Sequence, residues 1–218
     1  MFGLFKRRSG GGGKPSLDAV RFDTTGYAAQ GEPQPGKVRV WHTPEGDGLG
    51  VYFFPVPPDL PANAGSVEEL AEFYRRLLGD SGGKLVELRV VVTGACPAVR
   101  SILSVPQQPS GRTYVGSVTV PFRDFSFVIK CQCAEGGPTG LKEAVLFDRS
   151  RAADEPMKIE GGRFHIPGWD PDDPTHDAEF SDHPVARLRR VLDHVAGSLV
   201  VAGEVRELPG FAIPRSPA

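Results

Sequence analysis

Four runs of apolar, largely β-branched residues follow one another in the middle of the chain, each closed by a turn-prone break. The runs cover residues 85–93, 98–105, 113–121 and 125–133. Such runs fit a pleated, half-buried surface, and breaks this short favour antiparallel over parallel neighbours. The pattern therefore predicts four consecutive antiparallel strands.

A clean alternation of side-chain type precedes this region. Residues 38–42 place Val40 on one face of a predicted strand and Trp41 on the other. A turn at 44–48 then returns the chain into the apolar stretch 49–54. The two stretches predict a hairpin, and the prolines that follow end it because proline has no N–H to donate to a strand ladder.

Helical periodicity is clearest at residues 66–78. Ser66 followed by Glu69 forms a capping-box pattern, and Gly79 is a typical helix terminator. The apolar positions between them fall on one stripe, with charged residues opposite. We expect this amphipathic helix to lie across one face of the sheet.

Two more helices are predicted after the four strands. Residues 139–153 have good helix propensity with Thr139 as a cap, and a last strand is the alternative because apolar residues blur the stripe. Asp182 is expected to cap a third helix, with Pro184 near its first position, where a missing N–H costs little.

These elements predict an α+β fold, with an antiparallel sheet of about six strands flanked by two to three helices. A chain of 218 residues has room for one substantial core. We expect a flexible tail at 1–16, a single domain at 17–207 and a Pro-rich tail at 208–218. Within the domain, residues 38–153 form the core, and residues 154–201 add a loop and the last helix.

The composition is that of an ordinary globular protein, with 39% hydrophobic and 24% charged residues. A formal net charge of -2 gives no basic field, so we expect no nucleic-acid partner.

No stretch approaches the ~20 consecutive apolar residues of a membrane span. The first residues, MFGLFKRR at 1–8, place apolar before basic residues, which argues against a signal peptide. We therefore expect a cytoplasmic location, and weak membrane-surface contact through residues 1–8 is the alternative to a frayed terminus.

The cysteines are Cys96, Cys131 and Cys133. An odd, small number without metal-type spacing indicates reduced thiols. Cys131 and Cys133 are two apart on a predicted strand, so both side chains face the same way. We interpret them as small hydrophobes on one sheet face, the alternative being a vicinal metal or redox pair.

A run of carboxylates and imidazoles before the third helix is the most suggestive candidate for chemistry. Its members are Asp170, Asp172, Asp173, His176 and Asp177, followed by Glu179, Asp182 and His183. Hard oxygen ligands of this kind bind divalent cations, but the glycine and the closing glutamate of a calcium loop are missing. A solvated acidic loop beside a helix start is the preferred interpretation. A metal-dependent hydrolase or small-molecule enzyme is the alternative function.

Other catalytic patterns do not occur in the sequence. There is no Gly-x-Ser-x-Gly elbow, no glycine-rich phosphate loop between a strand and a helix, and no paired-cysteine zinc pattern. The histidines are scattered singly. The sequence therefore favours a non-enzymatic protein without a cofactor.

Aromatic residues concentrate in the predicted sheet and suggest a docking surface. If Trp41, Tyr52 and Tyr114 lie on the less covered face, they line a groove for an apolar helix or peptide of another protein. Packing in the core is the preferred interpretation, and the docking surface is the alternative. Arg187 and Arg190, on the outer side of the third helix, are the charged residues predicted to contact the same partner.

The order of elements resembles the PsbP-like fold over residues 38–153. The segment ACPAVRSILSVPQQPSGRTYVGSVTVPFRDFSFVIKCQC, residues 95–133, resembles the central meander of that fold. The family includes the photosystem extrinsic subunit, Ran-binding nuclear-import factors and small bacterial proteins that chaperone secretion effectors. Its members are mostly binding proteins, so the resemblance implies an adaptor or chaperone-like function and assigns no site residues.

Overall fold

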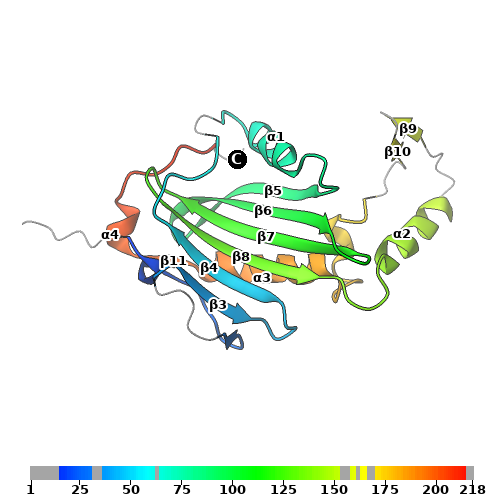
Figure 1. Cartoon of the computed structure of the whole chain (residues 1–218), viewed down its shortest axis with the longest axis horizontal. Coiled ribbons are helices and arrows are strands. Elements are labelled where there is room, and N and C mark those ends of the chain that lie inside the picture. Colours follow the sequence, from blue (N-terminus) through cyan, green and yellow to red (C-terminus); the bar gives the residue numbers. More distant parts are fainter. Residues whose placement is uncertain are drawn as a thin grey trace, which may run out of the picture.

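The structure is a computed structural model and describes residues 15–30, 36–61, 64–152, 158–160, 163–165 and 170–214. It confirms the α+β class, because the main sheet is antiparallel, has seven strands and carries helices on both faces (Figure 1). Residues 1–8, for which weak membrane-surface contact was the alternative to a frayed terminus, lie outside the described residues.

Every strand that the apolar runs predict is present in this sheet, with small shifts at the ends. In chain order they are β3 (Val38–His42), β4 (Gly48–Phe54), β5 (Lys84–Thr93), β6 (Cys96–Pro106), β7 (Arg112–Pro121) and β8 (Ser126–Ala134). The short strand β2 (Ala28–Ala29), which the sequence did not predict, pairs with β3. The order across the sheet is β2-β3-β4-β8-β7-β6-β5. The hairpin β3–β4 therefore lies beside the last strand of the four-strand run.

Smaller elements stand outside the main sheet. They are the 3-10 helices η1 (Leu17–Ala19) and η2 (Pro174–His176), the strand pair β1 (Val20–Arg21) with β11 (Val200–Val201), and the hairpin β9 (Lys158–Glu160) with β10 (Arg163–His165). The β1–β11 pair brings the start of the described chain next to the segment that follows the last long helix. Periodicity did not reveal these strands because each has only two or three residues.

The helix α1 (Val67–Leu78) begins and ends as predicted, with Ser66 as its N-cap and Gly79 as its C-cap. Of the two possibilities for the region after β8, the helix is the one observed, as α2 (Leu141–Ala152). The predicted cap of α2 was wrong, because the helix begins at Leu141 and the C=O of Gly140 accepts the Ala144 N–H at 3.0 Å, so Gly140 and not Thr139 is at the N-cap position.

The last long helix, α3 (Pro184–Ser198), has Pro184 at its first position as predicted. The prediction that Asp182 caps it was wrong. His183 is the N-cap, and its Nδ1 accepts the N–H of Val185 at 3.3 Å. A short helix, α4 (Gly203–Arg206), follows β11.

One face of the sheet is covered by α3, which runs behind β7 and β8 (Figure 1). The helix stripe of Leu188, Leu192 and Val195 is fully buried in the larger apolar core. Gly116 in β7 allows this close approach, because a Cβ there would lie 2.7 Å from Leu192 and 2.9 Å from Leu188. Cys131 and Cys133 pack in the same core as small hydrophobes, and the described cysteines are free thiols.

The opposite face is covered only in part. Leu70 of α1 is buried against Val90 in β5 and Val99 in β6, forming a second, smaller core. Ile213, in the predicted C-terminal tail, packs against this second core, so the described part of that tail lies on the domain. Over β4, β8 and β7 no helix of the described chain covers this face (Figure 1).

Candidate functional site

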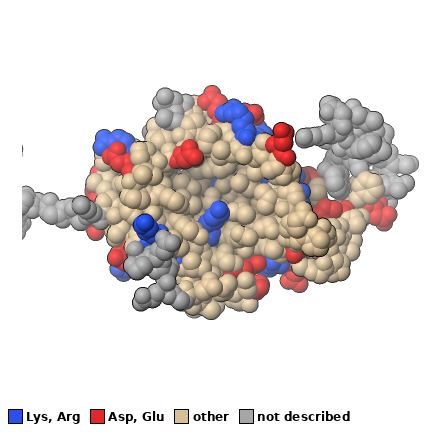
Figure 2. Space-filling model, in the orientation of Figure 1, with Lys and Arg blue, Asp and Glu red and all other residues tan. Residues whose placement is uncertain are grey.

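We call the uncovered area the open face. It consists of side chains that point away from α3, as the strand pairing shows: Val40, Gly48, Gly50, Tyr52, Val115, Ser117, Val128, Lys130 and Gln132. Figure 2 shows this side of the molecule, with few charged side chains across the middle and most of them at the rim. A cavity of about 490 Å³ opens at one end, lined by Gly48, Gly50, Tyr52 and Lys130 among others.

Apolar side chains on the open face belong to neither core. Val115 and Val128 are half-buried, but they pack in neither the α3 core nor the α1 core. Tyr52 lies flat on the sheet, because a Cβ at Gly50 would be 2.8 Å from its ring. Its ring also stacks on Phe54, with centroids 6.3 Å apart. This leaves an aromatic and aliphatic surface exposed in the middle of a rigid sheet.

The structure separates the aromatic residues that were predicted to bind a partner. Tyr52 lies on the open face, as described. The prediction for Tyr114 was wrong, since the side chain is only 1% exposed and points into the core on the α3 side. Trp41 also lies on the α3 side, where it packs edge-on against Phe22 with centroids 5.4 Å apart.

The two arginines predicted to contact a partner lie on the α3 side of the sheet. Arg187 donates to both carboxylate oxygens of Asp47, at 2.8 and 2.9 Å, and so joins α3 to the turn before β4. Arg190 is exposed and lies 3.9 Å from Glu45. Neither side chain is among the strand residues that define the open face, but Arg187 also lines the cavity at its end.

In the described part of the chain, the carboxylates and imidazoles of the acidic run before α3 do not converge on one point. Asp172 pairs with Lys84 at 2.7 Å, Asp177 pairs with Arg189 at 2.8 Å, and Asp173 caps η2. The proposed ligand set was Asp170, Asp172, Asp173, His176 and Asp177. Within the described part of the chain, none of them belongs to a group whose ligand atoms converge. These carboxylates instead hold the loop against the sheet and α3.

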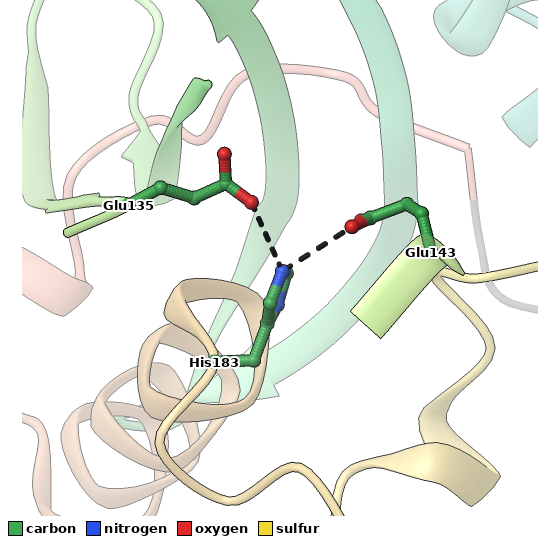
Figure 3. A group of neighbouring side chains, drawn as sticks. All are labelled: Glu135, Glu143 and His183. Carbon is green, nitrogen blue, oxygen red and sulfur yellow. Dashed lines mark ion pairs between the residues drawn. The ribbon is translucent and has the colours of Figure 1, made fainter. Parts of the chain in front are cut away.

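A different group of side chains does converge, and Figure 3 shows it. Glu135 directly follows β8, Glu143 lies in the first turn of α2, and His183 precedes α3. The Nε2 of His183 lies 3.5 Å from Oε1 of Glu135 and 3.7 Å from Oε1 of Glu143. Three elements that are separate in the sequence thus aim two carboxylates and an imidazole at one point.

Burial sets the protonation of this group. It lowers the pKa of His183 to about 4, with the positive charge of Lys142 as the next cause. Burial raises the pKa of Glu143 and lowers the pKa of Lys142. Buried charge is costly without a partner, so near neutrality the imidazole is uncharged.

Several polar atoms here have no hydrogen-bond partner among the residues that the structure describes. They are Nε2 of His183, Oε2 of Glu143 and Nζ of Lys142. The second oxygen of Glu135 is satisfied, because it accepts the N–H of Arg112 at 2.8 Å. Unpaired buried polar atoms are uncommon in native structures and call for an explanation.

Two cavities border this group. One, of about 690 Å³, is lined by Tyr114, Glu143 and Asp172. The other, of about 550 Å³, is lined by Glu135, Lys142 and His183. No sequence pattern pointed to Glu135 and Glu143, because each stands alone in a loop or helix. Only His183 was among the residues singled out, and it was grouped with the wrong carboxylates.

Comparisons with known proteins add little to this geometry. No family model and no curated protein matches the chain. A crystal structure of a protein from Bacteroides thetaiotaomicron matches with a TM-score of 0.31 and 11% identity, over 55% of this chain and 39% of that one. The chain thus spans about two fifths of the length of that protein, and a similarity this weak supports no conclusion about fold or function. No helix in the described part of the chain is long and apolar enough to cross a membrane.

Proposed function

We propose that this chain is a protein-binding protein that holds an amphipathic helix of another protein on the open face, beside α1. The observation that carries the proposal is the set of half-buried apolar side chains, among them Val115 and Val128, that neither core uses. Large exposed apolar areas on rigid elements are typical of interaction sites.

The dimensions of the open face suit a helix. Strands in a sheet lie about 4.8 Å apart, so β7, β8 and β4 together offer a floor about 10 Å wide. A helix with its side chains is about 10–12 Å across. The apolar stripe of the partner helix would rest on Val115, Val128 and the Tyr52 ring, while Lys130 and Gln132 contact its polar side.

Two expectations from the sequence agree with this proposal. The resemblance to the PsbP-like family, whose members are mostly binding proteins, points to the same class of function. Free cysteines favour a reducing compartment, and we propose the cytoplasm. Both expectations rest on pattern and composition alone.

Val128→Lys tests the proposal, because it places a charge in the middle of the open face without touching either core. Val92→Lys is the matched control, since Val92 lies on the edge strand β5 and is 78% exposed. A photo-crosslinking residue at Gln132 identifies the bound segment by mass spectrometry of the cross-linked peptide. Wild type, Val128→Lys and Val92→Lys are each immobilised, native lysate is passed over them, and the retained proteins are compared.

We expect a stoichiometric partner that wild type and Val92→Lys retain and Val128→Lys loses, cross-linked through a segment with helical apolar periodicity. Thermal melts of both variants check that folding is intact. If no stoichiometric partner is retained, or if Val128→Lys retains it as well as wild type, the proposal is wrong.

A further inference from the structure

We propose that Glu135, Glu143 and His183 bind one divalent transition-metal ion, with Zn²⁺ as the expected occupant. Zinc lies about 2.0–2.1 Å from imidazole nitrogen and carboxylate oxygen, which places two ligands of a tetrahedron about 3.3 Å apart. The distances from His183 Nε2 to the two carboxylates, 3.5 and 3.7 Å, are close to this spacing. The ligand atoms all lie within 4.8 Å of one another.

The unpaired atoms point to a missing ligand. The His183 side chain is 10% exposed, and within the described residues its Nε2 has no hydrogen-bond partner. Figure 3 shows this nitrogen directed between the two carboxylates. Oε2 of Glu143 is also buried and unpartnered. A cation at their common centre would be a partner for Nε2 of His183 and for Oε1 of Glu143, the oxygen that faces it, and would offset the repulsion between the two acidic groups.

The environment of the group contains charges of both signs. The positive charge of Lys142 repels a cation at this point, and the negative charge of Asp172 attracts one. Their opposite effects on the pKa of His183 reflect this, since Lys142 lowers it and Asp172 raises it. Burial lowers the pKa of Lys142, because the desolvated ammonium loses its hydration. A fourth ligand, such as water, can reach the ion because both neighbouring cavities are lined by members of the group.

Metal binding requires a change of tautomer at His183. Its Nδ1 accepts the Val185 N–H, so in the metal-free protein the neutral ring carries its proton on Nε2. When Nε2 coordinates the ion, that proton moves to Nδ1 and the helix-cap hydrogen bond is lost. One such bond is small beside the binding free energy of zinc sites. Protonation of the Glu143 carboxyl, whose pKa is raised by burial, competes with its binding of the ion.

The three cysteines are the main alternative zinc ligands in the described chain. The sulfurs of Cys131 and Cys133 lie 3.8 Å apart in the core. Cobalt distinguishes the two sites, because Co²⁺ bound to thiolate shows a sulfur-to-metal charge-transfer band, whereas Co²⁺ on nitrogen and oxygen shows only its visible d–d bands.

The test uses the full chain, freed of metal with a chelator. The protein is titrated with ZnCl₂ and CoCl₂, and binding is followed by calorimetry, by absorption spectroscopy and by the shift in melting temperature. The variants are His183→Asn, which keeps a good N-cap, and Glu143→Gln. The matched control is Glu179→Gln, an exposed carboxylate that pairs with Arg149.

We expect one ion per wild-type chain, a higher melting temperature with zinc, and cobalt d–d bands without a sulfur band. Each ligand variant should bind at least about tenfold more weakly, and Glu179→Gln should bind as wild type does. The absence of saturable binding to wild type overturns the proposal. So does binding that both ligand variants retain, or a cobalt spectrum with a sulfur band. Because Glu143→Gln leaves the α3 cap intact, the test stands even if His183→Asn does not fold.

Discussion

Glu87 in β5 and Arg100 in β6 form an ion pair inside the protein, with Nη1 of the arginine 2.7 Å from Oε1 of the glutamate. The two side chains are 8% and 6% exposed. The other oxygen of Glu87 lies 3.3 Å from Nε of Arg189 in α3. One carboxylate therefore joins the edge of the sheet to the helix that covers it.

Removal of this carboxylate should destabilise the fold strongly. Glu87→Ala leaves two buried guanidinium groups without their shared partner, and breaking a buried pair from one side costs about 3–5 kcal/mol. We expect a loss at the lower end of that range, because Arg189 also pairs with Asp177. Denaturant unfolding measures it. Asp124→Ala, which breaks the exposed pair with Arg123, is the control and should change stability little.

The sequence predicted the strand that carries Glu87 but not the role of this residue. The alternation in β5 indicated that Glu87 and Arg89 lie on a wet face. Glu87 is buried instead, because Arg189, 102 residues later in the chain, lies against it. A pattern that is read within one strand contains no information about a partner so distant.

The N-terminus of α1 gives a second prediction. Ser66 Oγ accepts the Glu69 N–H at 3.1 Å, and Glu69 Oε2 accepts the Gly65 N–H at 2.8 Å. Ser66→Ala should lower the unfolding free energy by about 1 kcal/mol, because a helix donor loses its acceptor. Ser66→Asp, which restores an acceptor, should recover most of the loss. Equal stability of all three proteins would contradict this role.

Comparison of α1 with α3 shows which boundaries can be predicted. Every signal for α1 is local, so its ends at Val67 and Leu78 match the expectation. At the start of α3 the expected cap was Asp182, but the observed N-cap is the next residue, His183. The path of the chain into the helix selects His183, and the sequence does not show that path.

Gly116 gives a third prediction. A Cβ at this position would lie within 3.0 Å of side-chain atoms of Leu188 and Leu192. Gly116→Val should therefore push α3 away from β7 and cost about 1–3 kcal/mol by overpacking. Gly136→Val, at a loop glycine with open space around it, is the control. A melting temperature for Gly116→Val equal to that of the control would rule out the close packing.

The candidate sites were less predictable than the fold. Tyr52 could be placed on a sheet face by alternation, but which face α3 covers depends on the whole topology, so Tyr114 was misplaced. The density of aspartates before α3 suggested metal chemistry, yet Lys84 and Arg189 neutralise two of them. The group that does converge draws single residues from three elements, and no spacing rule relates them.

The buried imidazole of His183 gives the last prediction, for the metal-free protein between pH 4 and pH 7. Burial lowers the pKa of His183 to about 4 in the folded state, against about 6.5 in the unfolded chain. The unfolded chain therefore binds more protons in this window, and the contribution of His183 to stability is lost as the pH falls from about 6.5 to about 4. The full loss amounts to about 3 kcal/mol.

Glu143 acts in the opposite direction. Its pKa is raised in the folded state, so its contribution is present at low pH and is lost as the pH rises. His183→Asn should therefore flatten the fall of stability on acidification, whereas Glu143→Gln should steepen it. Denaturant unfolding of the three proteins with chelator present, at intervals across the window, measures both slopes. Two variants that change the slope in the same direction would contradict this assignment of charges, because only opposite shifts of the two pKa values predict opposite effects.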